Sequence, residues 1–213
     1  MQTHDEGSLR LIKVGPLGPF NNNAYVIVDA AADEAAVVDM PAEGEKILEA
    51  AAGLRVGKIL LTHTHPDHWL SYDLLKGVTA APVYCHPAEA QMPAEHTDVP
   101  LVDGQELTVG KVSVRVIHTP GHTPGSVCFL VGRYLIAGDT IFPGGPGHSD
   151  TPEDLQQTIR SIIQRLYVLP DATLVLPGHG DDTTIGASRR EYAVFASRPH
   201  PPDLCGDVLW ETA

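Results

Sequence analysis

The chain has 213 residues, of which 43% are hydrophobic and 19% are charged, and its formal net charge at pH 7 is −13. This size suits one domain with its own core, and we expect residues 1–213 to form a single domain. The 14 lysines and arginines form no cluster that could neutralise a row of phosphates, which argues against a nucleic-acid partner.

The chain begins with a polar segment, MQTHDEGSLR, in which no basic region precedes an apolar one. No apolar run approaches the length of about 18 residues that a membrane helix requires. The three cysteines, an odd number without a Cys-X-X-Cys pair, argue against a disulfide framework. We therefore expect a cytoplasmic protein with no membrane partner.

Short apolar runs rich in valine and isoleucine recur along the chain and predict β-strands. In chain order they are RLIKV (10–14), AYVIVD (24–29), AAVVD (35–39), KILLT (58–62), PVYC (82–85), VSVRVI (112–117), SVCFLV (126–131), RYLIAGD (133–139) and TLVLPG (173–178).

Helical patterns fall between some of these strands. The third is the clearest, because Thr151 can cap it, Pro152 suits its first position and Asp154 completes an arrangement like a capping box. Strands mixed with helices in this way predict the α/β class. The four helical stretches are 43–52, 67–76, 152–167 and 186–196.

The strand at 58–62 ends in a histidine-rich motif, THTHPDH. His63 and His65 point the same way in an extended chain, so two imidazoles can share one cation. A turn then carries Asp67 and His68 onward, where an oxygen and a nitrogen can bind a second cation. Surface histidines at a strand end are the simpler interpretation. That many titratable groups packed together, however, need a metal or a charge to hold them.

Three further strand ends each place a residue of the metal-ligand type directly after a glycine. Taken alone, the aspartate is typical of a turn or a helix cap, and neither histidine is decisive. Glycine permits turns that aim a side chain into a shared cleft, so the three ends gain weight together. With the motif they supply five histidines and two aspartates, enough for two ions and one bridging carboxylate. Such ligands, without thiolates, suit zinc, iron or manganese. The pairs are Gly121 and His122, Gly138 and Asp139, and Gly178 and His179.

These segments resemble the metallo-β-lactamase superfamily in content and order: HTHPDH at 63–68, GH at 121–122, GD at 138–139 and GH at 178–179. The resemblance covers nearly the whole chain. It implies an αββα four-layer sandwich, two mixed sheets between helical layers, with the site at one sheet edge. It also implies that His63, His65 and His122 hold one ion, that Asp67, His68 and His179 hold the other, and that Asp139 bridges them.

Asp39 matches a frequent aspartate of this family that orients a ligand histidine. The β-lactamases proper usually have a cysteine near the bridging position, so Asp139 favours the glyoxalase II-like (hydroxyacylglutathione hydrolase-like) branch. Other features depart from that branch. Its Lys/Tyr pair is not evident in IFPGGPGHSD, Gly180 and Asp181 replace its usual tyrosine, and about 34 residues follow His179, too few for its glutathione-binding extension. Recognition of glutathione therefore stays open.

The resemblance implies a metal-dependent hydrolase with two divalent ions, zinc first and iron or manganese otherwise. Two such ions lower the pKa of a shared water from 15.7 towards about 7 and so supply hydroxide to a polarised carbonyl. Asp67 is the candidate to accept a proton as the tetrahedral intermediate collapses. We expect the substrate to be a small acyl compound, a thioester or an ester.

Other activities of the same fold stay open. A mononuclear iron persulfide dioxygenase would use the residues that correspond to His63, His122 and Asp139, and a lactonase would use the whole site. A metal-binding module without catalysis is a third possibility. Two metals per chain with oxygen-independent hydrolysis would favour the hydrolase, and one iron with oxygen uptake would favour the dioxygenase.

The sequence also suggests roles for several residues outside the predicted site. The glycine-rich loop 143–148 either covers the cleft, with His148 touching the substrate, or is an ordinary surface loop. Trp69 is expected in the core. His118 is expected to be structural, as are His86 and His96.

Overall fold

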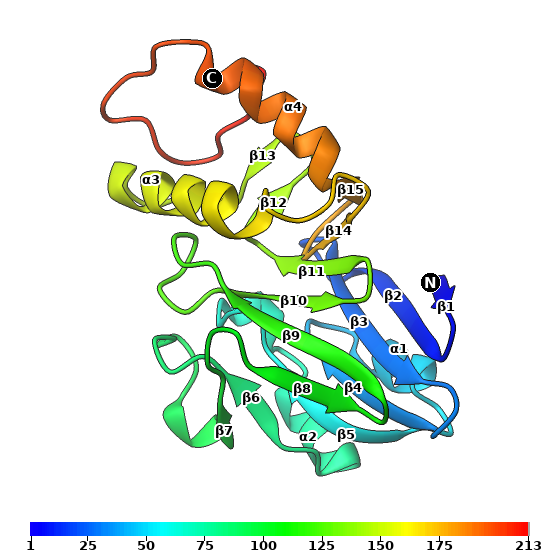
Figure 1. The fold of residues 1–213 in the computed structure, drawn as a ribbon. Coiled ribbons are helices and arrows are strands. Elements are labelled where there is room, and N and C mark those ends of the chain that lie inside the picture. The colour runs from blue at the N-terminus through cyan, green and yellow to red at the C-terminus, as the bar shows by residue number, and fades with distance from the viewer. Residues whose placement is uncertain (213) are drawn as a thin grey trace.

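The computed structural model describes residues 1–212, in which two β-sheets lie between two layers of helices (Figure 1). The first sheet has seven strands in sequential order, from β1 to β7. The second has six strands in the order β15-β14-β11-β10-β9-β8, and β12 and β13 form a separate two-stranded ribbon. The predicted αββα four-layer sandwich is confirmed.

Every strand that the sequence predicts is present, and the structure adds short ones that carry few apolar residues. The first sheet contains β1 (Gln2–Glu6), β2 (Leu9–Leu17), β3 (Asn22–Asp29), β4 (Glu34–Val38), β5 (Arg55–Leu60), β6 (Val83–Cys85) and β7 (Val99–Pro100). The second contains β8 (Glu106–Val109), β9 (Val112–His118), β10 (Val127–Val131), β11 (Tyr134–Gly138), β14 (Leu174–Pro177) and β15 (Thr183–Thr184). The ribbon is β12 (Ile141–Phe142) with β13 (Gly145–Pro146).

The helices are α1 (Gly44–Ala50), α2 (Tyr72–Thr79), α3 (Pro152–Ser161) and α4 (Ile185–Ala196), with short 3-10 turns at Pro66–His68 and Ala94–His96. The predicted capping of α3 is confirmed, since the hydroxyl of Thr151 accepts a hydrogen bond from the backbone N–H of Asp154 at 3.2 Å. A π-helical turn, Ile162–Leu166, continues α3.

The predicted helix 67–76 is wrong at its start. Its first residues form the 3-10 turn, and α2 begins only at Tyr72. The cause lies in the backbone, because the carbonyl of His68 accepts from the N–H of Met40 at 2.8 Å and the N–H of Ser71 donates to the carbonyl of Met40 at 2.9 Å. These bonds tie the segment to the end of β4 and interrupt the helical pattern.

Three groups of buried apolar side chains hold the layers together. Between the sheets, Tyr25 and Val38 lie in the same buried cluster as Phe129. A second cluster joins the first sheet to α1 and α2, and a third joins the second sheet to α3 and α4. The inward face of β9 illustrates the period of two, because Val112, Val114 and Val116 are buried while the residues between them are exposed.

The carboxyl ends of several strands meet at one edge of the sandwich. β4, β5 and β6 are parallel neighbours in the first sheet, and β11 and β14 are parallel neighbours in the second. The backbone N–H of Asn23 donates to the carbonyl of Gly178 at 2.7 Å, which links the two sheets there. Side chains that follow these strands are therefore brought close together.

Among the described residues, none of the helices has the length and apolar character needed to span a lipid bilayer. Cys85, Cys128 and Cys205 are free, as expected from the absence of a disulfide pattern.

Candidate metal centre

The segment after β5 is held by Asp39, which follows β4. The Asp39 carboxylate accepts from the backbone N–H of Thr62 at 2.8 Å and from its hydroxyl at 2.7 Å. The same hydroxyl oxygen lies 3.1 Å from Nδ1 of His63. Because the Thr62 hydroxyl donates its proton to Asp39, its oxygen accepts a hydrogen bond from Nδ1–H of His63. Nε2 of His63 then carries the lone pair, and it lies 3.3 Å from Nε2 of His122.

His65 and His122 complete a group of three imidazoles. Nδ1 of His65 lies 2.9 Å from Nε2 of His122, and each ligand atom of the His63, His65 and His122 group lies within 4.8 Å of the others. Nδ1 of His122 donates to the carbonyl oxygen of His148 at 2.9 Å. A carbonyl oxygen only accepts, so this bond fixes the tautomer of His122 that presents Nε2 to the group.

A second group forms from Asp67, His68 and His179, whose ligand atoms also lie within 4.8 Å of one another. Nε2 of His68 and Nε2 of His179 are 3.2 Å apart, and Nε2 of His179 is 3.3 Å from Oδ2 of Asp67. Nδ1 of His179 donates to the carbonyl oxygen of Phe20 at 2.8 Å. The rings of His63, His122 and His179 are therefore oriented by bonds on the side that faces away from the centre.

The carboxylate of Asp139 lies between the two groups. Its Oδ1 is 3.4 Å from Nε2 of His68, and its Oδ2 is 3.2 Å from Nε2 of His179 and 3.7 Å from Nε2 of His122. Oδ1 is buried and makes no hydrogen bond among the described residues. A buried carboxylate oxygen without a donor is costly unless a cation or a solvent molecule satisfies it.

The structure thus brings all the residues of the predicted site together. The three groups that could hold an ion, with Asp139 joined to His63 and His68 in the third, match the donor chemistry of two neighbouring divalent cations. The assignment of individual ligands stays a prediction.

The close packing of histidines and carboxylates in the metal-free chain shifts the pKa values of these groups. Burial would raise the pKa of the Asp139 carboxyl, but the charges of His68 and His63 together with a hydrogen bond from His179 outweigh burial and hold that pKa well below its usual range. Burial opposes the charged form of His179, yet its hydrogen bonds to Asp139 and Asp67 raise its pKa to about 10. Burial holds the pKa of His63 well below its ordinary value. Burial opposes the charged form of His68 as well, but the charges of Asp139 and Asp39 raise its pKa well above the ordinary value.

The glycine before His179 is required by close packing. A Cβ atom on Gly178 would lie 2.2 Å from Oδ1 of Asp139 and 2.7 Å from Cε1 of His68. Gly180, after the histidine, has open space around it and a φ of +65°, a conformation that favours glycine. One glycine admits the neighbouring ligands and the other turns the chain.

A cleft of about 320 Å³ opens onto the centre, with His122, Asp139 and His179 in its wall. Residues of the loop 143–148 line part of this cleft, so the loop is more than an ordinary surface loop. That it covers the cleft and that His148 touches the substrate stay predictions. The backbone carbonyl of His148 accepts the hydrogen bond that orients His122. The half-exposed ring of His148 is hydrogen-bonded to the carboxylate of Asp207 at 2.9 Å. The other histidines lie outside the cluster: His118 stacks on His86 and His96 stacks on Tyr72, each pair with ring centroids 4.1 Å apart.

Sequence reasoning missed several residues that contribute to this site. Asn22 donates to Oδ2 of Asp67 at 2.8 Å, the C-terminal residues Asp207 and Leu209 line the cleft, and Glu89 binds two of the loops that carry histidines. Asn22, Glu89 and Leu209 belong to no histidine-rich or glycine-flanked motif, and only the tertiary structure places them. Asp207 does follow a glycine, Gly206, but this pair does not end one of the predicted strands. Trp69 packs against the core as expected, and its Nε1 donates to the carbonyl of Thr64 at 3.1 Å.

Comparison with known proteins finds one matching family. Residues 17–179 match the family described as the metallo-beta-lactamase superfamily. The probable metallo-hydrolase YqgX of Bacillus subtilis is 35% identical over 196 residues, which cover 80% of this chain and 90% of that protein. The hydroxyacylglutathione hydrolase of Aeromonas hydrophila is 36% identical over 179 residues, which cover 82% of this chain and 67% of that protein.

Solved structures share the same fold. ETHE1 from Myxococcus xanthus superposes with a TM-score of 0.77 and 28% identity, over 88% of this chain and 86% of that one. TTHA1623, solved in a di-iron-bound form, superposes with a TM-score of 0.70 and 32% identity, over 84% of this chain and 97% of that one.

Proposed function

Because the chain belongs to the metallo-β-lactamase superfamily, we propose that it is a metal-dependent hydrolase of small thioesters or esters, similar to glyoxalase II. The observation that carries the proposal is the pair of ligand groups on either side of Asp139, at the floor of an open cleft. The similarity to a hydroxyacylglutathione hydrolase supports thioester chemistry.

Two divalent ions fit the donor set, with His63, His65 and His122 around one, Asp67, His68 and His179 around the other, and Asp139 shared. We propose zinc first, because imidazole and carboxylate ligands suit it. Iron is the alternative that the di-iron form of TTHA1623 supports, and manganese is a third. When bound, such a pair would lower the pKa of water and polarise a carbonyl group.

Asp67 is the residue that we assign to proton transfer. Its Oδ2 accepts from Asn22 and lies 3.3 Å from His179, and its side chain keeps 21% of its surface exposed. Hydrolysis adds water to the acyl carbon and breaks the bond from carbon to sulfur or oxygen. A carboxylate in this position can take the proton of the water and give it to the departing thiolate or alkoxide.

The cleft favours small acyl groups. Phe142, Pro146 and Leu209 give it an apolar wall, and Asp207 adds a carboxylate. No lysine or arginine is among the described residues that line it, so the carboxylates of a glutathione moiety would find no basic partner there. We therefore propose thioesters or esters with small, weakly charged leaving groups ahead of glutathione conjugates.

A mononuclear iron persulfide dioxygenase is the second candidate. The observation in its favour is that His63, His122 and Asp139 lie together: Nε2 of His122 is 3.3 Å from that of His63 and 3.7 Å from Oδ2 of Asp139. A lactonase would need only a cyclic ester in the same cleft.

The test combines metal analysis of the purified protein with a substrate panel. The panel contains S-lactoylglutathione, thioesters without glutathione, lactones, and glutathione persulfide with oxygen uptake as the readout. We expect about two metals per chain and hydrolysis that does not consume oxygen. One iron per chain with oxygen uptake would replace the hydrolase by the dioxygenase.

The matched variants are His65→Ala and His4→Ala. His65 lies in the cluster, and its loss should lower the metal content and abolish hydrolysis. His4 lies on β1, outside the cluster, with its ring against Tyr134. Its variant should keep both metals and full activity, and full activity in His65→Ala would remove that residue from the site.

A further inference from the structure

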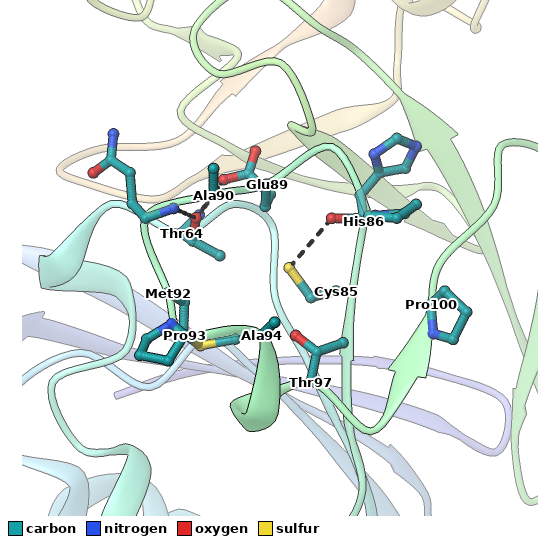
Figure 2. Close-up of a pocket in the computed structure, with 12 residues that line it drawn as sticks. Thr64, Cys85, His86, Glu89, Ala90, Met92, Pro93, Ala94, Thr97 and Pro100 are labelled. Carbon is teal, nitrogen blue, oxygen red and sulfur yellow. Dashed lines mark hydrogen bonds between the residues drawn. The ribbon is translucent and has the colours of Figure 1, made fainter.

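A second cavity, of about 620 Å³, lies beside the metal centre and shares no lining residue with the cleft. Thr64, Cys85, Glu89 and Met92 are in its wall (Figure 2). Thr64 stands between two of the predicted ligands, His63 and His65. The wall of this cavity is thus the reverse side of the loop that carries them.

The carboxylate of Glu89 joins two separate loops, with one oxygen for each. Oε2 accepts from the backbone N–H of Thr64 at 2.9 Å and from its hydroxyl at 2.5 Å. Oε1 accepts from the backbone N–H of Gly125 at 2.9 Å and from the hydroxyl of Thr123. Thr123 directly follows His122. Figure 2 shows Glu89 and Thr64 next to each other at one edge of the cavity.

Close packing supports the same arrangement. A Cβ atom on Gly125 would lie 2.7 Å from Cγ of Glu89 and 2.8 Å from its Oε1, so glycine is what lets the carboxylate reach that loop. The charge of Glu89 is met by two N–H and two O–H donors, with no lysine or arginine among its described partners. Four donors on one carboxylate leave its oxygens no other role within the protein.

We propose that Glu89 is a positioning residue for the half of the centre made by His63, His65 and His122. His63 and His65 come from the loop after β5, and His122 comes from the loop after β9, so their mutual distances depend on how these two loops are joined. Glu89 joins them at positions adjacent to all three histidines. The inference rests on metal binding by those histidines, as proposed above, and on no particular substrate.

The test measures metal binding by the protein freed of metal with a chelator and titrated with Co²⁺, whose visible absorption reports the ligand geometry. The variant is Glu89→Gln, which replaces an acceptor oxygen by a donor NH₂ group. Glu95→Gln is the control, because Glu95 is an exposed glutamate in the 3-10 turn of the same segment. Both are also made on a His179→Ala background, which removes a ligand of the other half and leaves the three-histidine site to be observed.

We expect Glu89→Gln to weaken Co²⁺ binding at the three-histidine site about 10-fold to 100-fold, the usual effect of losing a group that orients ligands. Its absorption spectrum should also change, while Glu95→Gln should match the parent. If Glu89→Gln does not fold, Thr123→Val removes one of the same bonds, and Thr123→Ser should restore binding.

Two results would overturn the proposal. One is a lower melting temperature of Glu89→Gln with an unchanged cobalt titration and spectrum, which is the behaviour of a purely structural brace. The other is an equal loss at both halves of the centre. A parent protein that binds no cobalt would instead refute the metal site itself, and with it the proposed function.

Discussion

The carboxylate of Asp39 accepts a hydrogen bond from Nδ1 of His68 at 3.0 Å, and both side chains are 1% exposed. A carboxylate has no proton to give, so Nδ1 is the protonated nitrogen and Nε2 faces the centre. Asp39 also binds the segment that leads to His63 through Thr62. One buried carboxylate thus orients residues of both halves of the predicted site.

We predict that Asp39→Asn lowers the affinity of the centre for Co²⁺ or Zn²⁺ about 10-fold to 100-fold. Asp39 has a φ of +61°, which asparagine tolerates nearly as well as aspartate, so the substitution changes the charge without adding backbone strain. Isothermal titration of the metal-free protein measures the effect. Asp73→Asn, on the exposed face of α2, should bind metal like the parent. Equal affinities in the two variants would show that the hydrogen bond to His68 does not matter.

The glycines on either side of His179 allow a sharper comparison. In Gly178→Ala the new methyl group would collide with Asp139 and His68, so these side chains must move. We predict a loss of hydrolysis of about 100-fold, the scale expected for displacement of reacting groups by about 1 Å. Gly180→Ala meets no atom and should cost only about 1 kcal/mol of stability, because of its φ of +65°. Rate assays with thermal melts compare the two, and similar activities would contradict the packing argument.

The sequence predicts the central strands well because each contains a run of apolar residues that is long enough to be recognised as a strand. The strands that it misses carry little of that signal. β1 is QTHDE, which pairs antiparallel with β2 through its backbone and buries almost nothing. β12, β13 and β15 have two residues each, and their pairing depends on the loops around them.

The residues of the site likewise divide into those that the sequence predicts and those that it misses. The residues of the predicted cluster are recognisable because each belongs to a local motif of ligand types and glycines, and a shared sheet edge brings the motifs together. Glu89 and Asn22 act through hydrogen bonds to partners 25 or more residues away. No local pattern marks them. The error in the helix at 67–76 has a similar origin, since bonds to Met40 override the local preference.

The stability of the metal-free protein should depend on pH through His179. Its pKa is raised to about 10 from an ordinary value of 6.5, so its contribution is complete below about pH 6.5 and is lost as the pH rises towards 10. The pKa values of Asp67 and Asp139 are lowered, so their contributions are present above about pH 4 and are lost in acid. The pKa values of His63 and His65 are lowered by burial, so their contributions act in the opposite sense and are lost as the pH falls below about 6.5. We predict the highest melting temperature near pH 6.5, where both kinds of contribution are present.

Melting curves in a chelating buffer, followed by circular dichroism from pH 4 to pH 10, check this profile. In His179→Gln the fall on the alkaline side should be smaller, because His68 alone then supplies a raised histidine pKa in the cluster. Bound metal should reverse the alkaline trend, since the ion needs deprotonated imidazoles and binds more tightly as the pH rises. Metal-free melting temperatures that increase from pH 6.5 to 10 would contradict the assignment.

The C-terminal segment offers a matched pair of neighbouring residues. Trp210 is fully buried against Tyr192 and Phe195, and its backbone N–H donates to the carbonyl of Gly144 at 2.7 Å, whereas the side chain of Leu209 is exposed at the cleft. We predict that Trp210→Ala lowers the free energy of unfolding by about 3 to 5 kcal/mol, as for other buried tryptophans. Leu209→Ala should change it by about 0.5 kcal/mol or less.

The same pair separates stability from substrate binding. Leu209→Ala removes apolar wall from the cleft, so it should raise KM while kcat stays near that of the parent. Urea unfolding and steady-state kinetics on one thioester measure both effects, with metal content as the control for an intact centre. A Leu209→Ala protein with unchanged KM would place the substrate away from this wall. Because Trp210 anchors the segment to the loop that carries His148, a Trp210→Ala protein that still folds should also show a raised KM.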